Sequence, residues 1–137
     1  MEKRDESRSL TGWSSFKRAL RYGVLICFSL LFVGYLCICF SIRHSVKEIS
    51  TRATEEHPGD RVEALMTYVE AKSHSLRKRN RAVWALGQIG DSRAVGVLEK
   101  FRTGKPCDHS SQLCQRELEK AIKASKGSFN TAAWLPR

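Results

Sequence analysis

The sequence predicts an all-α protein with one transmembrane helix and a short domain of about four helices. Three observations lead to this fold class. A stretch without any charged residue covers 21 positions, 22–42. After residue 60, apolar residues recur with the i, i+3, i+4, i+7 spacing of a helix face. No segment shows the alternating pattern that is typical of a half-buried strand.

The uncharged stretch, YGVLICFSLLFVGYLCICFSI, is long enough to cross a bilayer. At about 1.5 Å per residue its helix would span roughly 30 Å, the thickness of the hydrocarbon core. A buried helix of a soluble protein and a cleaved signal peptide are the alternatives. No small-residue cleavage site follows, because Ser41 and Ile42 lead directly into Arg43. We therefore expect an uncleaved signal anchor.

The chain is basic, with 24 Lys and Arg against 14 Asp and Glu in 137 residues, a net charge of +10. Such a balance favours anionic partners: phospholipid head groups, nucleic acid or acidic proteins. Six cations precede the span and three follow it at a comparable distance: Lys3, Arg4, Arg8, Lys17, Arg18 and Arg21, then Arg43, Lys47 and Arg52. Because positively charged flanks stay in the cytoplasm, we expect a cytoplasmic N-terminus and an extracytoplasmic C-terminal domain.

The predicted organisation has five segments in order. They are a polar N-terminal segment 1–21, the transmembrane helix 22–42, a linker 43–59, a helical domain 60–126 and a C-terminal tail 127–137. Some of the linker is expected to continue the transmembrane helix.

Cap residues and apolar spacing divide the helical domain into four predicted helices. Asp60 and Glu63 have the spacing of a capping box for a helix over 60–74. A second helix is predicted over 76–89. Asp91 or Ser92 would cap a third helix, which ends near 101. Ser110 or Ser111 would cap a fourth, which ends at Lys126-Gly127.

The stretch RAVWALGQIGDSRAV, residues 81–95, predicts a tight helical hairpin. Gly87 and Gly90 do not form a nucleotide-binding loop, because no strand precedes them and Asp91-Ser92 stands where a phosphate loop has Lys-Ser or Lys-Thr. Gly90 instead suits the turn and Asp91 the next cap. The small side chains of Ala82, Ala85 and Gly87 would let neighbouring helices come close.

The same stretch resembles the HEAT-like repeat of the phycobilisome-lyase type. In that family an R-x-x-A-x-x-A-L-G-x-I-G-D run forms the first helix and its turn, and A-V-x-x-L forms the second helix, which is similar to residues 94–98 here. The resemblance extends over 81–101, with helices 60–74 and 110–125 as degenerate neighbouring half-repeats. It implies a short HEAT-like α-solenoid, a fold whose members mostly bind proteins. It does not imply lyase activity.

Two cysteines, Cys107 and Cys114, lie in the soluble part of the chain. Outside the cytoplasm they can form a disulfide that joins a loop to the fourth helix. Unpaired thiols are the first alternative. A metal site with Asp108 and His109 is the second, although the spacing of the cysteines departs from that of structural zinc sites. We expect the disulfide, and no metal or cofactor.

Four residues on one side of the second predicted helix form a candidate partner-binding surface: Arg77, Arg81, Trp84 and Gln88. An aromatic ring among arginines is a common binding platform. The alternative is that Trp84 packs against an adjacent helix. Trp134 in the tail is a further candidate, either folded back with Phe129 and Leu135 over the third and fourth helices or free to anchor a partner.

The sequence contains little that points to catalysis. His44, His57, His74 and His109 do not stand in any recognised nucleophile motif. We expect a membrane-anchored scaffold, not an enzyme, whose partners are the lipid bilayer and either another protein or a second copy of itself. The alternative is a basic module at the cytoplasmic membrane face that binds anionic lipid or nucleic acid, of which nucleic acid is the less expected partner.

Overall fold

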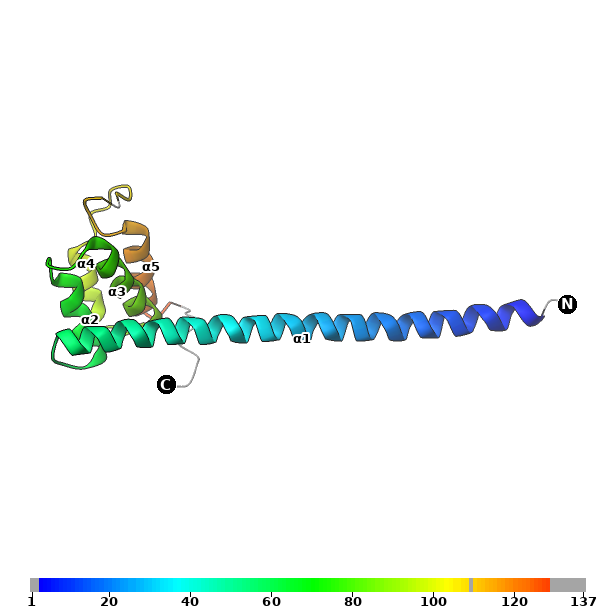
Figure 1. Cartoon of the computed structure of the whole chain (residues 1–137). Helices are drawn as coiled ribbons and strands as arrows, with labels where there is room; N and C mark the ends of the chain where they lie inside the picture. Colours follow the sequence, from blue (N-terminus) through cyan, green and yellow to red (C-terminus); the bar gives the residue numbers. More distant parts are fainter. Residues whose placement is uncertain (1–2, 109, 129–137) are drawn as a thin grey trace. The chain divides into compact units, whose positions relative to one another are not determined.

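A computed structural model describes residues 3–108 and 110–128, with side chains described from residue 16 onward. The described residues form an all-α fold, as the sequence predicts (Figure 1). Its helices are α1 (Lys3–Glu56), α2 (Arg61–Glu70), α3 (Leu76–Ile89), α4 (Ala94–Lys100) and α5 (Gln115–Ser125). The chain divides into two compact units, Met1–Phe40 and Ser41–Arg137.

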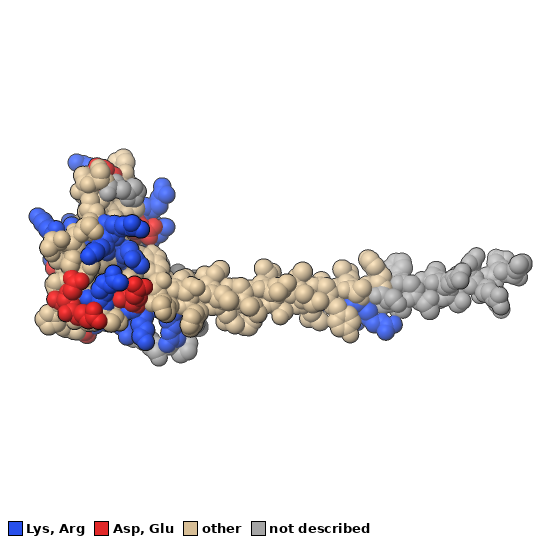
Figure 2. Space-filling model, in the orientation of Figure 1, with Lys and Arg blue, Asp and Glu red and all other residues tan. Residues whose placement is uncertain are grey.

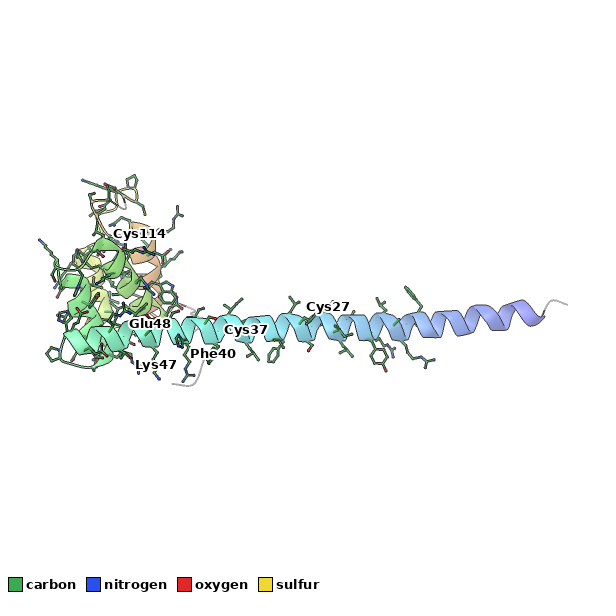
Figure 3. All side chains as sticks on the ribbon, viewed as in Figure 1. Cys27, Cys37, Phe40, Lys47, Glu48 and Cys114 are labelled. Atoms are coloured by element: carbon green, nitrogen blue, oxygen red, sulfur yellow. The ribbon has the colours of Figure 1, made fainter. Side chains whose placement is uncertain are left out.

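The first unit consists of the N-terminal part of α1, and its described large apolar side chains are exposed, whereas Cys39 is buried. Phe28, Leu31 and Phe40 are each about two-thirds exposed or more, and Figure 3 shows side chains standing out all round this helix. In the described residues, one helix is long and apolar enough to cross a membrane, and it lies near the N-terminus. A membrane anchor and a signal sequence share these properties.

The helix α1 does not end with its apolar segment but continues to Glu56, through most of the expected linker 43–59. This last part of α1 belongs to the second unit and contributes to its core. Ala53 is fully buried, Ser50 is buried, and Val46 and Ile49 are partly buried against the same core. The non-helical connection to α2 is therefore short, from His57 to Asp60.

Three helices of the second unit bury side chains at the same spacing, i, i+3, i+4 and i+7. The sets are Val46, Ile49, Ser50 and Ala53 on α1, Arg79, Ala82, Val83 and Leu86 on α3, and Leu118, Ala121, Ile122 and Ser125 on α5. The shorter helices α2 and α4 alternate with them along the chain. The end of α1 therefore contributes side chains to the same core as α3 and α5, which the sequence did not predict.

The beginning of α2 and the end of α3 follow local signals in the sequence. Asp60 forms the predicted capping box: its side chain accepts from the N–H groups of Val62 and Glu63, and Glu63 accepts from the N–H of Asp60. Gly90 ends α3 in the left-handed conformation at φ 69°, with its N–H bonded to the Leu86 carbonyl at 2.9 Å. Both predictions are confirmed. The two features were predictable because each depends only on residues a few positions apart.

The start of the last helix was predicted wrongly. Ser110 and Ser111 do not cap it; both hydroxyls donate instead to Asp108, and α5 begins only at Gln115, with Cys114 at the N-cap. The N–H of Cys114 donates to the side chain of Asn80 on α3, at 2.9 Å. A contact with a residue distant in sequence therefore fixes this start. The predicted cap of the third helix is also wrong. The N-cap of α4 is Arg93, without a side-chain cap, and Asp91 accepts from the N–H of Arg93 in the turn before the helix.

The core is formed where α3 and α5 pack together, with α2 and α4 against them. Leu65, Leu86, Leu98 and Leu118, one from each of these helices, are fully buried. A Cβ placed on Gly87 would lie 2.9 Å from the Cα of Ala121, closer than real atoms come. Glycine at this position is what allows α3 and α5 to approach so closely.

Candidate protein-docking surface

The predicted surface on α3 is divided by the structure between two grooves. Trp84 and Gln88 line a groove between α3 and α5, whereas Arg81 lines a second groove beside the end of α1. Arg77 lies one turn further toward the N-terminus of α3 and is exposed. The four residues share one stripe of the helix, but the neighbouring helices separate them into two environments.

The first groove, here called the α3–α5 groove, has a volume of about 240 Å³. Its lining residues are Trp84, Gly87 and Gln88 from α3, with Glu117, Lys120, Ala121 and Ala124 from α5. Three of these residues, Gly87, Ala121 and Ala124, are small, and Gly87 is in close contact with Ala121. Glu117 and Lys120 form an ion pair of 3.1 Å, so both signs of charge line the groove.

Trp84 itself is half-buried and packs partly against the core while it lines this groove. The two interpretations of this residue, packing and partner contact, therefore do not compete. Its packed edge holds the ring in place, and a ring held in this way loses little conformational entropy when a partner covers the rest. The residues of α5 in the groove were missed from the sequence because their partner helix could not be identified there.

The second groove, here called the α1–α3 groove, is much smaller, with a volume of about 20 Å³, and more of its lining residues are charged. Its lining residues are Glu48, Ile49 and Arg52 from α1, Tyr68 from α2, and Lys78 and Arg81 from α3. Arg52 pairs with Glu48 at 3.1 Å. The three cations and one carboxylate among these residues leave a positive balance, which suits an anionic group better than an apolar side chain.

The basic run 77–81 is not a uniform patch, because two of its members hold the fold together. Arg79 is buried; its Nε donates to the Val69 carbonyl at 2.7 Å and its guanidinium lies 5.3 Å from the centre of the Phe101 ring. Burial lowers the pKa of Arg79 from its ordinary value. Asn80 accepts from Cys114, as described above. The sequence contained a signal for the burial of Arg79, because this residue stands three positions before Ala82 and so lies on the apolar face of the helix.

Cys107 and Cys114 are brought together but not bonded. Their Sγ atoms lie 3.5 Å apart and both thiols are free, whereas a disulfide needs about 2.05 Å. The N–H of Arg116 donates to Cys107 Sγ at 3.3 Å, and this bond, followed by the contact with Cys114, lowers the pKa of the Cys107 thiol. The disulfide predicted from the sequence is thus not formed in this structure and stays a prediction for oxidising conditions.

The alternative of a metal site at these cysteines finds little support among the described residues. The side chains of Ser110 and Ser111 donate to Asp108 and lower the pKa of its carboxyl group to about 2. Asp108 therefore stabilises its own turn. His109 lies outside the described residues, as do Trp134, Phe129 and Leu135, the tail residues expected to cover the third and fourth helices.

Charged side chains cover the second unit with both signs mixed, while the middle of α1 shows neither sign (Figure 2). Arg93 pairs with Asp60 at 2.6 Å and with Asp91 at 3.0 Å. Lys100 pairs with Glu70 and Lys126 with Glu99, at 2.8 and 2.7 Å. A surface that pairs its cations in this way differs from the single-sign stripe of a typical nucleic-acid interface.

Comparison with known proteins agrees with the geometry of the hairpin. The family described as PBS lyase HEAT-like repeat matches residues 78–101, which contain most of α3, its turn and α4. No curated protein and no solved structure matches the chain. The matched residues include the close approach at Gly87, the left-handed Gly90 and the turn in which Asp91 accepts from the N–H of Arg93. The chain therefore contains a PBS lyase HEAT-like repeat, at residues 78–101.

Proposed function

We propose that this protein is a single-pass membrane-anchored scaffold that docks a partner protein in the α3–α5 groove. The groove carries the proposal: it is lined by a half-buried tryptophan, small residues and an ion pair, on a repeat of a class that generally mediates protein interactions. Aromatic anchors set among near-neutral contacts are typical of interface hot spots. The proposal assigns no catalysis to the chain.

The membrane anchor supports the same function. A repeat module tethered by α1 would be confined close to the membrane. The effective concentration of membrane-bound partners would then be high, so even a weak contact would be occupied. The surplus of cations before the span favours a cytoplasmic N-terminus and a repeat domain outside the cytoplasm. Because α1 continues to Glu56, the anchor and the second unit would share one helix.

The alternative is a basic module that binds anionic lipid at the cytoplasmic face. The α1–α3 groove supports it, because Arg52, Lys78 and Arg81 all line that groove. Nucleic acid is the weaker form of this alternative, since acidic residues are mixed with the cations on the surface. Binding to phosphates would weaken steeply with added salt, whereas docking through Trp84 would change much less.

The test is site-specific photo-crosslinking in native membranes with the full-length chain. A crosslinker at Gln88 or at Ala124, on opposite sides of the α3–α5 groove, is expected to capture the same protein. The control is a crosslinker at Lys123, which is exposed on α5 outside that groove. The adduct should weaken with Lys120→Glu and persist with Lys123→Glu, which makes the same charge change outside the groove.

Equal capture at all three positions, or an adduct insensitive to Lys120→Glu, would contradict docking in this groove. If the captured protein is the chain itself, differently tagged copies will also purify together. If the crosslinks join lipid instead and disappear at high salt, the alternative at the cytoplasmic face is supported.

A further inference from the structure

Two histidines that stand far apart in the sequence meet at the end of α1. His57 directly follows α1, and its N–H bonds to the Ala53 carbonyl at 2.9 Å. His74 lies in the turn between α2 and α3, with its N–H bonded to the Ala71 carbonyl at 3.3 Å. Their ring centres are 5.8 Å apart. The fold therefore joins the end of α1 and the α2–α3 turn at these imidazoles.

Glu56, the last residue of α1, completes a cluster of three groups that can ligate a metal ion. One potential ligand atom from each of Glu56, His57 and His74 lies within 4.8 Å of the other two. His74 Nε2 is 3.3 Å from Glu56 Oε2. The side chain of His74 is 13% exposed and that of Glu56 is 41% exposed, so the cluster has a buried side and an open one.

Tyr68 holds the two imidazoles in their orientation. Its ring stacks on His74, with centres 3.8 Å apart and planes only 8° from parallel, and it meets His57 edge-on at 5.9 Å. Burial, followed by the charge of Glu56, raises the pKa of Tyr68. Rings fixed by stacking are arranged before any ligand arrives, which reduces the entropy lost on binding.

One ring nitrogen of each histidine is buried without a hydrogen bond to any described residue. Nε2 of His57 and Nε2 of His74 are buried, and neither has a hydrogen-bond partner among the residues that the structure describes. The contact of His74 with Glu56 has the distance of an ion pair without the alignment of a hydrogen bond. Buried polar atoms are nearly always satisfied, so two orphaned nitrogens beside one carboxylate need an explanation.

We propose that Glu56, His57 and His74 form a binding site for a divalent cation of the zinc type. Two neutral imidazoles and one carboxylate are a ligand set that Zn²⁺ takes up with water in its fourth position. Tetrahedral bonds of about 2.0–2.1 Å place ligand atoms roughly 3.3–3.5 Å apart. The pair of His74 and Glu56 already has that separation, and a ligand atom of His57 lies within 4.8 Å of both.

The consequence is a metal-dependent link between α1 and the repeat module. Glu56 and His57 belong to the end of α1, whereas His74 belongs to the turn that precedes α3. A bound cation would hold these segments together and favour the packing of Ala53 in the core. Imidazole ligands select zinc, nickel and copper over magnesium and calcium, which prefer oxygen. The link is independent of what occupies the α3–α5 groove.

A simpler explanation covers only half of the observations. If His74 were protonated, it would pair with Glu56 and no metal would be needed. That arrangement leaves Nε2 of His57 buried and unsatisfied, and it predicts no affinity for zinc. The two explanations therefore differ in a direct binding measurement.

The test is titration of Zn²⁺ alone into the full chain, purified in detergent and stripped with EDTA. Cys107→Ser and Cys114→Ser are included throughout, because thiolates are themselves zinc ligands and would confuse the stoichiometry. We expect one Zn²⁺ per chain and a rise in melting temperature that EDTA reverses. His57→Gln and Glu56→Gln should each weaken binding at least about tenfold, because each removes a ligand. His44→Gln, an exposed histidine on α1, should bind like the parent.

Circular dichroism would show that each variant remains helical. Absence of stoichiometric binding to the folded parent overturns the site. So does undiminished affinity in both a folded His57→Gln variant and a folded Glu56→Gln variant. Magnesium at the same concentration serves as the control cation and is expected to leave the melting temperature unchanged.

Discussion

Arg79 shows how a single residue can look like part of a binding patch and act as part of the core. It stands in the middle of a basic run, yet its side chain satisfies the Val69 carbonyl, one of the last carbonyls of α2, at 2.7 Å. The C-terminal end of a helix leaves four carbonyls without intrahelical partners, so a buried donor that bonds one of them stabilises the fold. A charge removed from water in this way is stable only while its hydrogen bond persists.

Replacement of Arg79 therefore tests its structural role. Arg79→Met keeps most of the apolar stem but leaves the Val69 carbonyl without its donor, and we expect a loss of about 1.5–3 kcal/mol in stability. Arg77→Met, two positions away and exposed, should change stability by less than about 0.5 kcal/mol. Thermal unfolding of the full chain in detergent, followed by circular dichroism, measures both. Equal effects would mean that Arg79 is merely another surface cation.

Two glycines give a matched pair of substitutions with opposite expected results. In Gly87→Ala the new Cβ would lie 2.9 Å from a backbone atom of Ala121, so α3 and α5 must separate, at a cost of about 1–3 kcal/mol. Gly96 lies in α4, with nothing within 4 Å of an added Cβ. Gly96→Ala should stabilise the chain by about 0.5–1 kcal/mol through the unfolded state. If both changes stabilise, the close packing of α3 on α5 is wrong.

At the scale of elements, Arg93 connects the cap of α2 with the turn that precedes α4. It donates to Asp60, which caps α2, and to Asp91, which precedes α4. The pKa of Asp60 is lowered first by the backbone N–H of Glu63 and then by Arg93, and that of Asp91 is lowered first by Arg93 itself. These bonds hold the starts of α2 and α4 in a fixed relation.

The lowered pKa values determine how stability depends on pH. Both carboxyl groups hold fewer protons when folded, so their contribution is complete above the unfolded pKa of 3.8 and is lost as pH falls through the lower folded values. Arg93→Met should reduce the melting temperature at neutral pH, and the difference from wild type should shrink as pH drops below 3.8. Arg77→Met is the control. A difference that stays constant down to the acid transition would contradict this linkage.

Elements whose ends depend on local residues were predictable, and those fixed by distant contacts were not. The capping box at Asp60 and the left-handed turn at Gly90 follow from residues within four positions of each other. The start of α5 depends on Asn80, which is 34 residues away, and the predicted serine caps failed because Asp108 accepts from both serines. Arg81 and Trp84 lie in different grooves because different helices pack beside them, and the sequence alone does not show which helices these are.

At the scale of the whole molecule, membrane sidedness determines the chemistry of the cysteine pair. The Sγ atoms of Cys107 and Cys114 lie 3.5 Å apart, and the lowered pKa of the Cys107 thiol increases its thiolate fraction. We predict that the pair is oxidised in protein isolated from an extracytoplasmic domain, so neither thiol is alkylated until a reductant is added. Prompt alkylation of both thiols in freshly lysed cells would place the domain in a reducing compartment. Cys114→Ser, which leaves Cys107 unpaired, is the control for its reactivity.

The central claim is that α1 remains attached as an anchor and holds the repeat domain outside the cytoplasm. Protease treatment of intact spheroplasts, with an epitope tag at the C-terminus, tests it most directly. We predict that the tagged protein resists alkaline extraction, has the full chain mass of 15.6 kDa plus the tag, and loses the tag to external protease. A soluble tagged fragment that lacks the apolar segment 22–42 would show instead that this segment is a cleaved signal, and complete protection of the tag until lysis would reverse the orientation.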